Sequence, residues 1–94
     1  MPPINRYFIG YYTETSERIG FGNTMVDVDF IITENQHLRF LENYVKRTAK
    51  KEGKELLVVT VVSFQKVGKV SEDVPDPISL SVPDIKMLKR KFGI

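Results

Sequence analysis

Apolar and polar residues alternate with period two in the first third of the chain, which predicts two β-strands. Residues 6–14 are rich in aromatic and β-branched side chains, which favour strands. Residues 21–32 form a second such run, and alternate residues from Val26 to Ile32 put apolar side chains on one face. Residues 15–18 (TSER) between the runs have turn chemistry. The pattern therefore predicts a β-hairpin.

Two registers of this hairpin keep the same faces together. A turn centred on residues 16–17 places Tyr12 opposite Phe21. A turn centred on residues 17–18 slides the pairing without exchanging the faces, whereas a one-residue slip of a single strand would exchange them. Both registers place Arg6 opposite an aspartate, and the pattern does not choose between them.

The apolar period changes from two to helical spacing after the hairpin. Thr33 is the expected N-cap, and Gln36 three residues later fits a capping box. The expected buried stripe contains Leu38, Leu41, Val45 and Thr48, widened by Phe40 and Tyr44. Gly53, preceded by lysines, is a typical C-terminal stop.

The last third contains one apolar run, a polar segment and a short helix. Residues 56–64 (LLVVTVVSF) are apolar on both faces, which is typical of a central strand covered on both sides. Residues 68–81 are charged and rich in proline, so we expect little regular structure there. Pro83 begins a short helix with Ile85, Leu88 and Phe92 on one face.

Together these elements predict an α+β fold with the order β-β-α-β. The expected sheet is three-stranded and mainly antiparallel, with one helix packed on one face and a short C-terminal helix. We expect residues 1–67 to form the core domain and residues 68–94 to form a linker and a docked helix. The third strand is expected beside the first or the second, and the pattern leaves that pairing open.

The composition fits one small globular domain. The 94 residues are 41% hydrophobic and 28% charged, within the range of folded proteins. The chain has no cysteine, which excludes disulfides, zinc–thiolate sites and thiol nucleophiles. Because no secretory signal or apolar run of ~20 residues is present, we expect a cytoplasmic protein.

The glycine-rich stretch around residues 20–25 (GFGNTM) raises the question of a phosphate-binding loop. Met25 stands where a dinucleotide fingerprint has its third glycine, and the stretch precedes a strand rather than a helix. We therefore expect Gly20 or Gly22 to supply a positive φ or a bulge near the hairpin, with Gly22 lying under Tyr11.

No constellation of side chains indicates catalysis. Asp27 and Asp29 share a strand face and could hold a divalent ion, but Arg6 should neutralise one of them. His37 is the only histidine, and no nucleophile or orienting carboxylate accompanies it by spacing. We expect an ion-paired strand face and a surface or partly packed histidine. The prediction is a non-enzymatic protein with no cofactor, no metal and no evident small-molecule substrate.

An apolar sheet face is the most informative feature of the sequence. If the helix covers the face with Val26 and Val28, the opposite face is unusually apolar. We predict that it is a partner-binding surface consisting of Phe8, Tyr12, Phe21, Met25 and Ile31. Its cover is either the C-terminal tail or a second protein, and the latter is a target protein or a second copy in a homodimer.

Positive charge supports an alternative function. Residues 1–35 have a net charge of −3, residues 36–55 of +3 and residues 56–94 of +2, giving +2 in total. The alternative is a small RNA- or DNA-binding module that uses helix and tail cations. Its expected contacts are Arg39, Lys46, Lys50, Lys89, Arg90 and Lys91.

About residues 5–67 have an order of segments that is similar to a known type of protein. The segments read RYFIGYYTETSERIGFGNTMVDVDFIIT, then LRFLENYVKR, then LLVVTVVSFQKV. This order resembles a type of small phage and prophage protein with an aromatic first strand, a Gly-x-Gly-Asn second strand, a helix and a final apolar strand. The resemblance implies an accessory protein of a mobile element. Such proteins include small binders that inhibit host machinery or host defence, and a phage origin would make the expected location the host cytoplasm.

Overall fold

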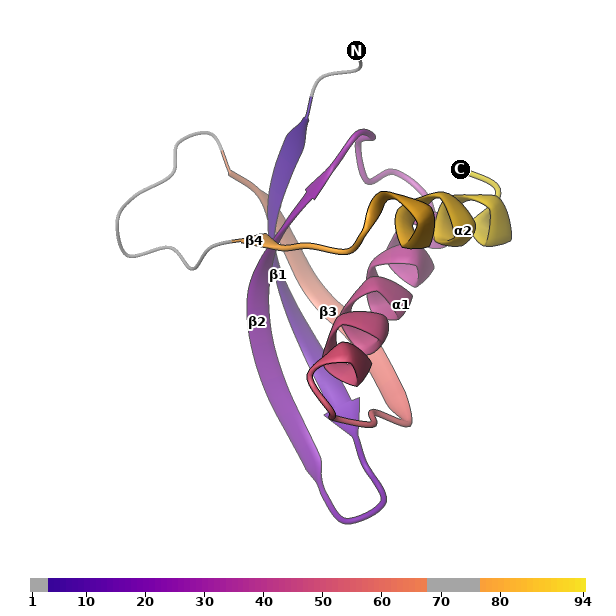
Figure 1. Cartoon of the computed structure of the whole chain (residues 1–94). Helices are drawn as coiled ribbons and strands as arrows, with labels where there is room; N and C mark the ends of the chain where they lie inside the picture. Colours follow the sequence, from indigo (N-terminus) through magenta and orange to yellow (C-terminus); the bar gives the residue numbers. More distant parts are fainter. Residues whose placement is uncertain (1–3, 68–76) are drawn as a thin grey trace.

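The computed structural model describes residues 4–67 and 77–94, and its fold is α+β as expected. Four strands form a mixed sheet in the order β3-β1-β2-β4, and both helices lie on one side of it (Figure 1). The elements are β1 (Asn5–Glu14), β2 (Ile19–Val28), α1 (Asn35–Lys51), β3 (Val58–Lys66), β4 (Pro77–Ile78) and α2 (Val82–Phe92). Within the described residues, neither helix is long and apolar enough to cross a membrane.

The hairpin adopts the register whose turn is centred on residues 16–17. Tyr12 lies opposite Phe21, and Glu14 opposite Ile19 is the last residue pair before the turn. Inside the turn, the Thr15 hydroxyl accepts hydrogen bonds from the backbone N–H groups of Glu17 and Arg18. At the other end, Arg6 pairs with Asp27 at 2.7 Å, which confirms the expected arginine–aspartate pairing.

The second strand is shorter than expected, because the chain leaves the sheet after Val28. The buried Tyr7 hydroxyl accepts a hydrogen bond from the Ile32 N–H at 3.0 Å and holds the departing segment. Phe30, expected on the strand, instead stacks on His37 with ring centroids 4.6 Å apart. An interaction with a helix side chain thus replaces continued strand pairing there.

The first helix begins one residue later than expected, with Glu34 as N-cap in place of Thr33. The expectation missed His37, whose Nδ1 accepts hydrogen bonds from the backbone N–H groups of Thr33 and Glu34. The imidazole thereby satisfies donors that a helix start leaves without partners. The expected end is confirmed, since Gly53 has a φ of 82° just beyond the helix.

The third strand pairs with β1 but lies at the edge of the sheet, so its expected central position is wrong. Only Val59 of this strand is buried, while Val58, Val62 and Phe64 are exposed. A β-bulge shifts its register opposite Gly10. The apolar residues of β3 therefore lie on both faces of an edge strand. No described element packs on one of these two faces.

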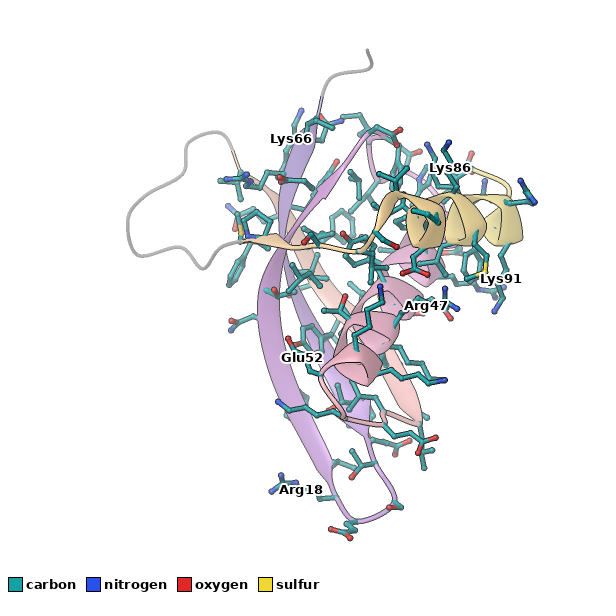
Figure 2. All side chains as sticks on the ribbon, viewed as in Figure 1. Arg18, Arg47, Glu52, Lys66, Lys86 and Lys91 are labelled. Carbon is teal, nitrogen blue, oxygen red and sulfur yellow. The ribbon has the colours of Figure 1, made fainter. Side chains whose placement is uncertain are left out.

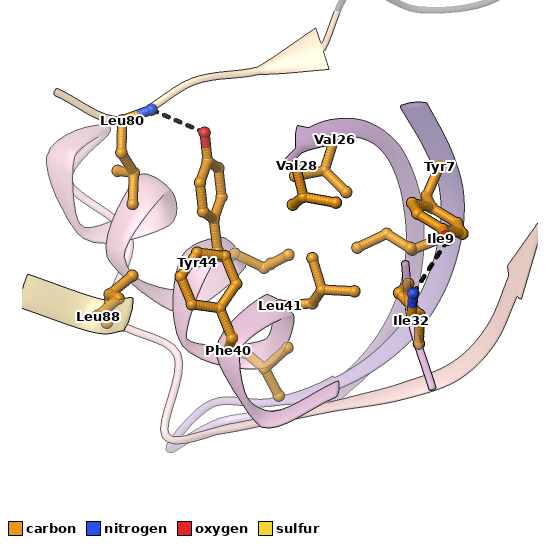
Figure 3. Packing of buried hydrophobic residues seen from close by; sticks show 12 residues of the cluster. Tyr7, Ile9, Val26, Val28, Ile32, Phe40, Leu41, Tyr44, Leu80 and Leu88 are labelled. Atoms are coloured by element: carbon orange, nitrogen blue, oxygen red, sulfur yellow. Dashed lines mark hydrogen bonds between the residues drawn. The ribbon is translucent and has the colours of Figure 1, made fainter. Parts of the chain in front are cut away.

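The core lies between the sheet and the helices (Figure 3). The sheet contributes Tyr7, Ile9, Val26, Val28 and Val59, and α1 contributes Phe40, Leu41, Tyr44 and Val45. The expected α1 stripe is thus confirmed at its centre. The Tyr44 hydroxyl accepts a hydrogen bond from the Leu80 N–H at 3.0 Å and donates to the Ile78 carbonyl at 3.3 Å.

The C-terminal segment packs on the helix side of the sheet. Leu80 and Leu88 are buried in the core, and α2 lies beside α1 (Figure 1). The alternative in which this tail covers the opposite sheet face is therefore wrong for the described residues. Most of the expected irregular segment, residues 68–76, lies outside the described residues. Pro77–Ile78 forms the short strand β4, which pairs parallel to β2.

Candidate functional site

The sheet face opposite the helices, here called the open face, is not covered by any described helix or strand. Register places on it one residue in two from each of the three long strands. The apolar and aromatic side chains of this face that keep exposed surface are those of Phe8, Tyr12, Ile19, Phe21, Val58 and Val62. Val62 joins this face because the β-bulge puts both Val62 and Ser63 opposite Gly10.

The open face is strongly apolar at its hairpin end. Phe21 is 78% exposed, and Ile19 and Val62 are each 61% exposed. The rings of Tyr12 and Phe21 meet edge to face, with centroids 5.6 Å apart. Large apolar side chains gathered on one exposed surface are typical of a contact with another macromolecule.

Register places three charged residues on the open face, and two of them form an ion pair. Arg6 holds Asp27, and the Tyr12 hydroxyl donates a hydrogen bond to the Glu14 carboxylate at 2.6 Å. That hydrogen bond raises the pKa of the Tyr12 phenol above its usual value, so the phenol remains a donor at neutral pH. Glu14 keeps its negative charge, because a hydrogen bond from a neutral phenol does not neutralise a carboxylate.

The structure separates the five residues predicted to bind a partner. Phe8, Tyr12 and Phe21 share the open face, although Phe8 and Tyr12 are half-buried. Met25 has the same orientation but is fully buried, opposite Phe8 and paired with Pro77, so it offers no free surface. Ile31 is exposed but lies beyond the end of β2, outside the face.

Sequence reasoning missed three exposed residues of the open face. Ile19 begins β2 earlier than the expected start at residue 21, and period two would have placed it on the same face as Phe21. Val58 and Val62 were assigned to a central strand. Their placement depends on the edge position of β3 and on its bulge, neither of which leaves a signal in the sequence.

The glycines of the hairpin allow close packing and do not adopt a positive φ. Among the described residues, positive φ occurs at Gly53 and Gly93, so the expected positive φ at Gly20 or Gly22 is wrong. The expected bulge lies between β1 and β3 instead of within the hairpin. Gly22 does lie under Tyr11, since a Cβ there would be 2.8 Å from the tyrosine ring.

The candidate acid–base and metal-binding groups have structural partners. Asp27 pairs with Arg6, and Asp29 pairs with Lys89 at 2.8 Å, which confirms an ion-paired arrangement. His37 caps α1 and stacks on Phe30, as a partly packed histidine would. Across residues 4–67 and 77–94, no group of three side chains is arranged to hold a metal ion.

A cavity of about 240 Å³ lies between the hairpin and the C-terminal end of α1. Tyr11, Val45 and Leu56 are among its lining residues, with Glu52 at its rim. Burial, and secondarily the Glu52 carboxylate, raises the pKa of the Tyr11 phenol. A neutral phenol among mainly apolar groups can donate one hydrogen bond but is a poor nucleophile or base.

The cations proposed for nucleic-acid binding come together from two elements. Lys46 and Lys50 of α1 and Lys91 of α2 line one groove between the helices. Arg39 and Arg90 are exposed on the same two helices. Lys89 instead pairs with Asp29. From the sequence, the cations of the first helix and those of the C-terminal tail are two separate patches. The contact between α1 and α2 joins them in one surface.

Comparison with family models, curated proteins and solved structures gives no match for this chain.

Proposed function

We propose that this protein is a non-enzymatic binding protein that acts through protein–protein contact at the open face, and that a second copy of the chain occupies this face. The single observation that carries the proposal is the exposure of Phe21, at 78%, beside Tyr12 and Ile19 on a face free of described elements. Aromatic side chains of this kind supply much of the binding energy of protein interfaces.

The third strand supports this reading. Its residues are apolar on both faces, yet in the single chain Val58 and Val62 are exposed. Strands that are apolar on both faces are typical of sheets covered on both sides. A second copy placed on the open face would provide that missing cover, because two sheets pack face to face about 10 Å apart.

The charge distribution favours a second copy meeting the chain through this face. The two helices together carry nine basic and two acidic residues, a balance of +7. Two copies that met through their helices would bring these like charges together. Contact through the open face keeps the helical layers on the outside, and the Arg6–Asp27 ion pair leaves Glu14 as the one unneutralised charge that the register of the described strands places on that face.

The experiment compares the wild-type chain with the double variant Tyr12→Ser/Phe21→Ser by sedimentation equilibrium. The wild type is expected at twice the chain mass of 10.8 kDa. Loss of Phe21 burial removes roughly 2 kcal/mol per copy, or about 4 kcal/mol per dimer, which weakens association by about a thousandfold. The double variant is therefore expected at the monomer mass.

The matched control is Val82→Ser/Met87→Ser, which truncates two exposed apolar residues on α2. This control should stay dimeric. A single Phe21→Lys variant covers the case in which the double variant fails to fold, since Phe21 contributes little to the core of one chain. A wild type that remains monomeric at high concentration would overturn the choice of a second copy, as would a Phe21→Lys variant that dimerises unchanged.

The lack of a catalytic role stays a prediction, as does action on host machinery or host defence as a phage accessory protein. The open face supports the binding proposal in either case, because it depends on exposed side chains and not on the biological source.

A further inference from the structure

Positive charge is concentrated on the helical layer, on the side of the sheet opposite the open face. Because the helices sum to +7 and the whole chain to +2, the remaining residues sum to −5. Figure 2 shows Arg47, Lys86 and Lys91 on the helices, away from Arg18 at the hairpin tip and Lys66 on β3. The two helices therefore form a cationic layer that the net charge of +2 conceals.

The helices enclose a groove of about 300 Å³ with cations on both walls. Lys46, Arg47 and Lys50 line it from α1, and Lys91 lines it from α2. The amide of Asn43 and the side chains of Met87 and Leu88 complete the lining. Four cations and an amide around one groove provide several donors for an extended anion at a single place.

Some of these cations have oxygen partners within the described part of the fold, whereas others have none, although Lys91 lies over the Phe92 ring at 5.5 Å from its centroid. Asp84 binds both Arg47, at 3.0 Å, and Lys51, which joins α2 to α1. The Lys46 ammonium donates to the Leu57 carbonyl at 3.1 Å. Among the described residues, no carboxylate pairs with Lys50, Lys86, Arg90 or Lys91. These four charges remain available to an external anion.

We propose that this groove and the cations beside it bind the phosphate backbone of double-stranded nucleic acid. Cations spread over two helices match a ligand whose charges repeat along its length, as phosphates do. The side chains present are ammonium, guanidinium and amide donors, the groups that contact phosphate oxygens without reading sequence. This site lies apart from the open face and does not rest on the proposed function.

Two other ligand classes fit the layer less well. Single strands are held by stacking on exposed aromatic rings, but the aromatic residues that the described structure exposes most, Phe21 and Phe64, lie on strands. Insertion into a membrane surface requires an apolar helix face turned outward. Here α1 buries Phe40, Leu41 and Val45 in the core, and α2 buries Leu88.

The test is fluorescence anisotropy with a short labelled DNA duplex over a series of salt concentrations. Neutralising about four phosphates predicts a slope near −3.6 for the logarithm of the association constant against that of salt. Lys50→Gln/Lys91→Gln removes one cation from each wall of the groove. It should reduce the slope by about two and weaken binding roughly 50-fold at 0.1 M salt, because each contact contributes about a factor of 8 there.

The matched control is Arg18→Gln/Lys66→Gln, which removes the same net charge from exposed positions outside the helical layer. It should bind the duplex as the wild type does. An RNA duplex of the same sequence should also bind, since the contacts are to phosphates. The proposal is overturned if no duplex binds at low salt, if the control weakens binding equally, or if anionic phospholipid vesicles compete while duplexes do not.

Discussion

Tyr44→Phe tests how the C-terminal segment is fixed to the core. The substitution removes one oxygen atom and keeps the ring in place among the residues that it packs against. That oxygen makes two hydrogen bonds. It accepts from the Leu80 N–H at 3.0 Å (Figure 3), and it donates to the Ile78 carbonyl at 3.3 Å. Tyr44 is 3% exposed and Leu80 is 8% exposed, so water cannot readily replace the missing partner.

The expected loss follows from those two bonds. Each contributes about 1 kcal/mol net, and a buried N–H left without a partner costs about 1–3 kcal/mol. We therefore expect Tyr44→Phe to lower the free energy of unfolding by roughly 2–3 kcal/mol. With a urea m-value of about 1.5 kcal/mol/M for a small domain, the midpoint should fall by about 1–2 M.

The matched control is Tyr12→Phe, which also removes one hydroxyl. In the monomer, water can take over the hydrogen bond that Tyr12 donates to Glu14 on the open face. At chain concentrations low enough to keep both variants monomeric, the expected change is therefore within about 0.5 kcal/mol. Urea unfolding followed by circular dichroism measures both variants. Equal midpoints for Tyr44→Phe and Tyr12→Phe would refute the reasoning that Tyr44 anchors the segment around β4.

Two further substitutions test the packing of the hairpin and of the helices. Gly22→Ala places a Cβ 2.8 Å from the Tyr11 ring and should cost about 1–3 kcal/mol in urea unfolding, whereas Gly20→Ala, whose nearest neighbour is Thr13 Oγ1 at 3.3 Å, should cost much less. Equal losses would contradict the close approach of Tyr11. Asp84→Asn should lower the melting temperature at neutral pH, because hydrogen bonds from Lys51 and then Ser81 hold the Asp84 pKa below its usual 3.8. That stabilisation is present above the unfolded-state pKa of 3.8 and is lost as the pH falls through the lower folded-state pKa, so wild type and variant should converge in acid. A difference that persists there would contradict the ion-pair origin.

The hairpin and the first helix are predictable because their signals are local. Period-two alternation and turn residues together limit the hairpin to two registers, each of which places an aspartate opposite Arg6. Helical spacing identifies Leu41 and Val45 as buried. Each of these features depends on residues near in sequence or on a single pairing, so one sequence is enough to find them.

The errors concern positions that only tertiary packing decides. An apolar strand such as β3 has the same sequence pattern whether it lies at the centre of a sheet or at an edge with one face uncovered. The apolar stripe that contains Leu88 predicts that α2 buries one of its faces. It does not predict on which side of the sheet α2 packs. The joining of Lys50 and Lys91 in one groove follows from that placement, and so could not be predicted from either helix alone.

Met25 and Ile31 show the same limit within the candidate site. Alternation gave Met25 the correct face but did not predict its full burial, nor its pairing with β4, a two-residue strand without a sequence signal. Ile31 was assigned by extending the alternation beyond Val28. A hydrogen bond to the Tyr7 hydroxyl ends the strand early, and that contact spans 25 residues in sequence.

The most direct test of the open face as a contact between two copies is a distance measured across the dimer. The chain has no cysteine, so Asn23→Cys places one spin label on the open face, and Lys86→Cys places one on the helical layer. Pulsed electron paramagnetic resonance then reports the distance between the two copies. We predict a clearly shorter distance for the Asn23→Cys label than for the Lys86→Cys label. The absence of any dipolar coupling between copies, or the reverse order of the two distances, would contradict the account.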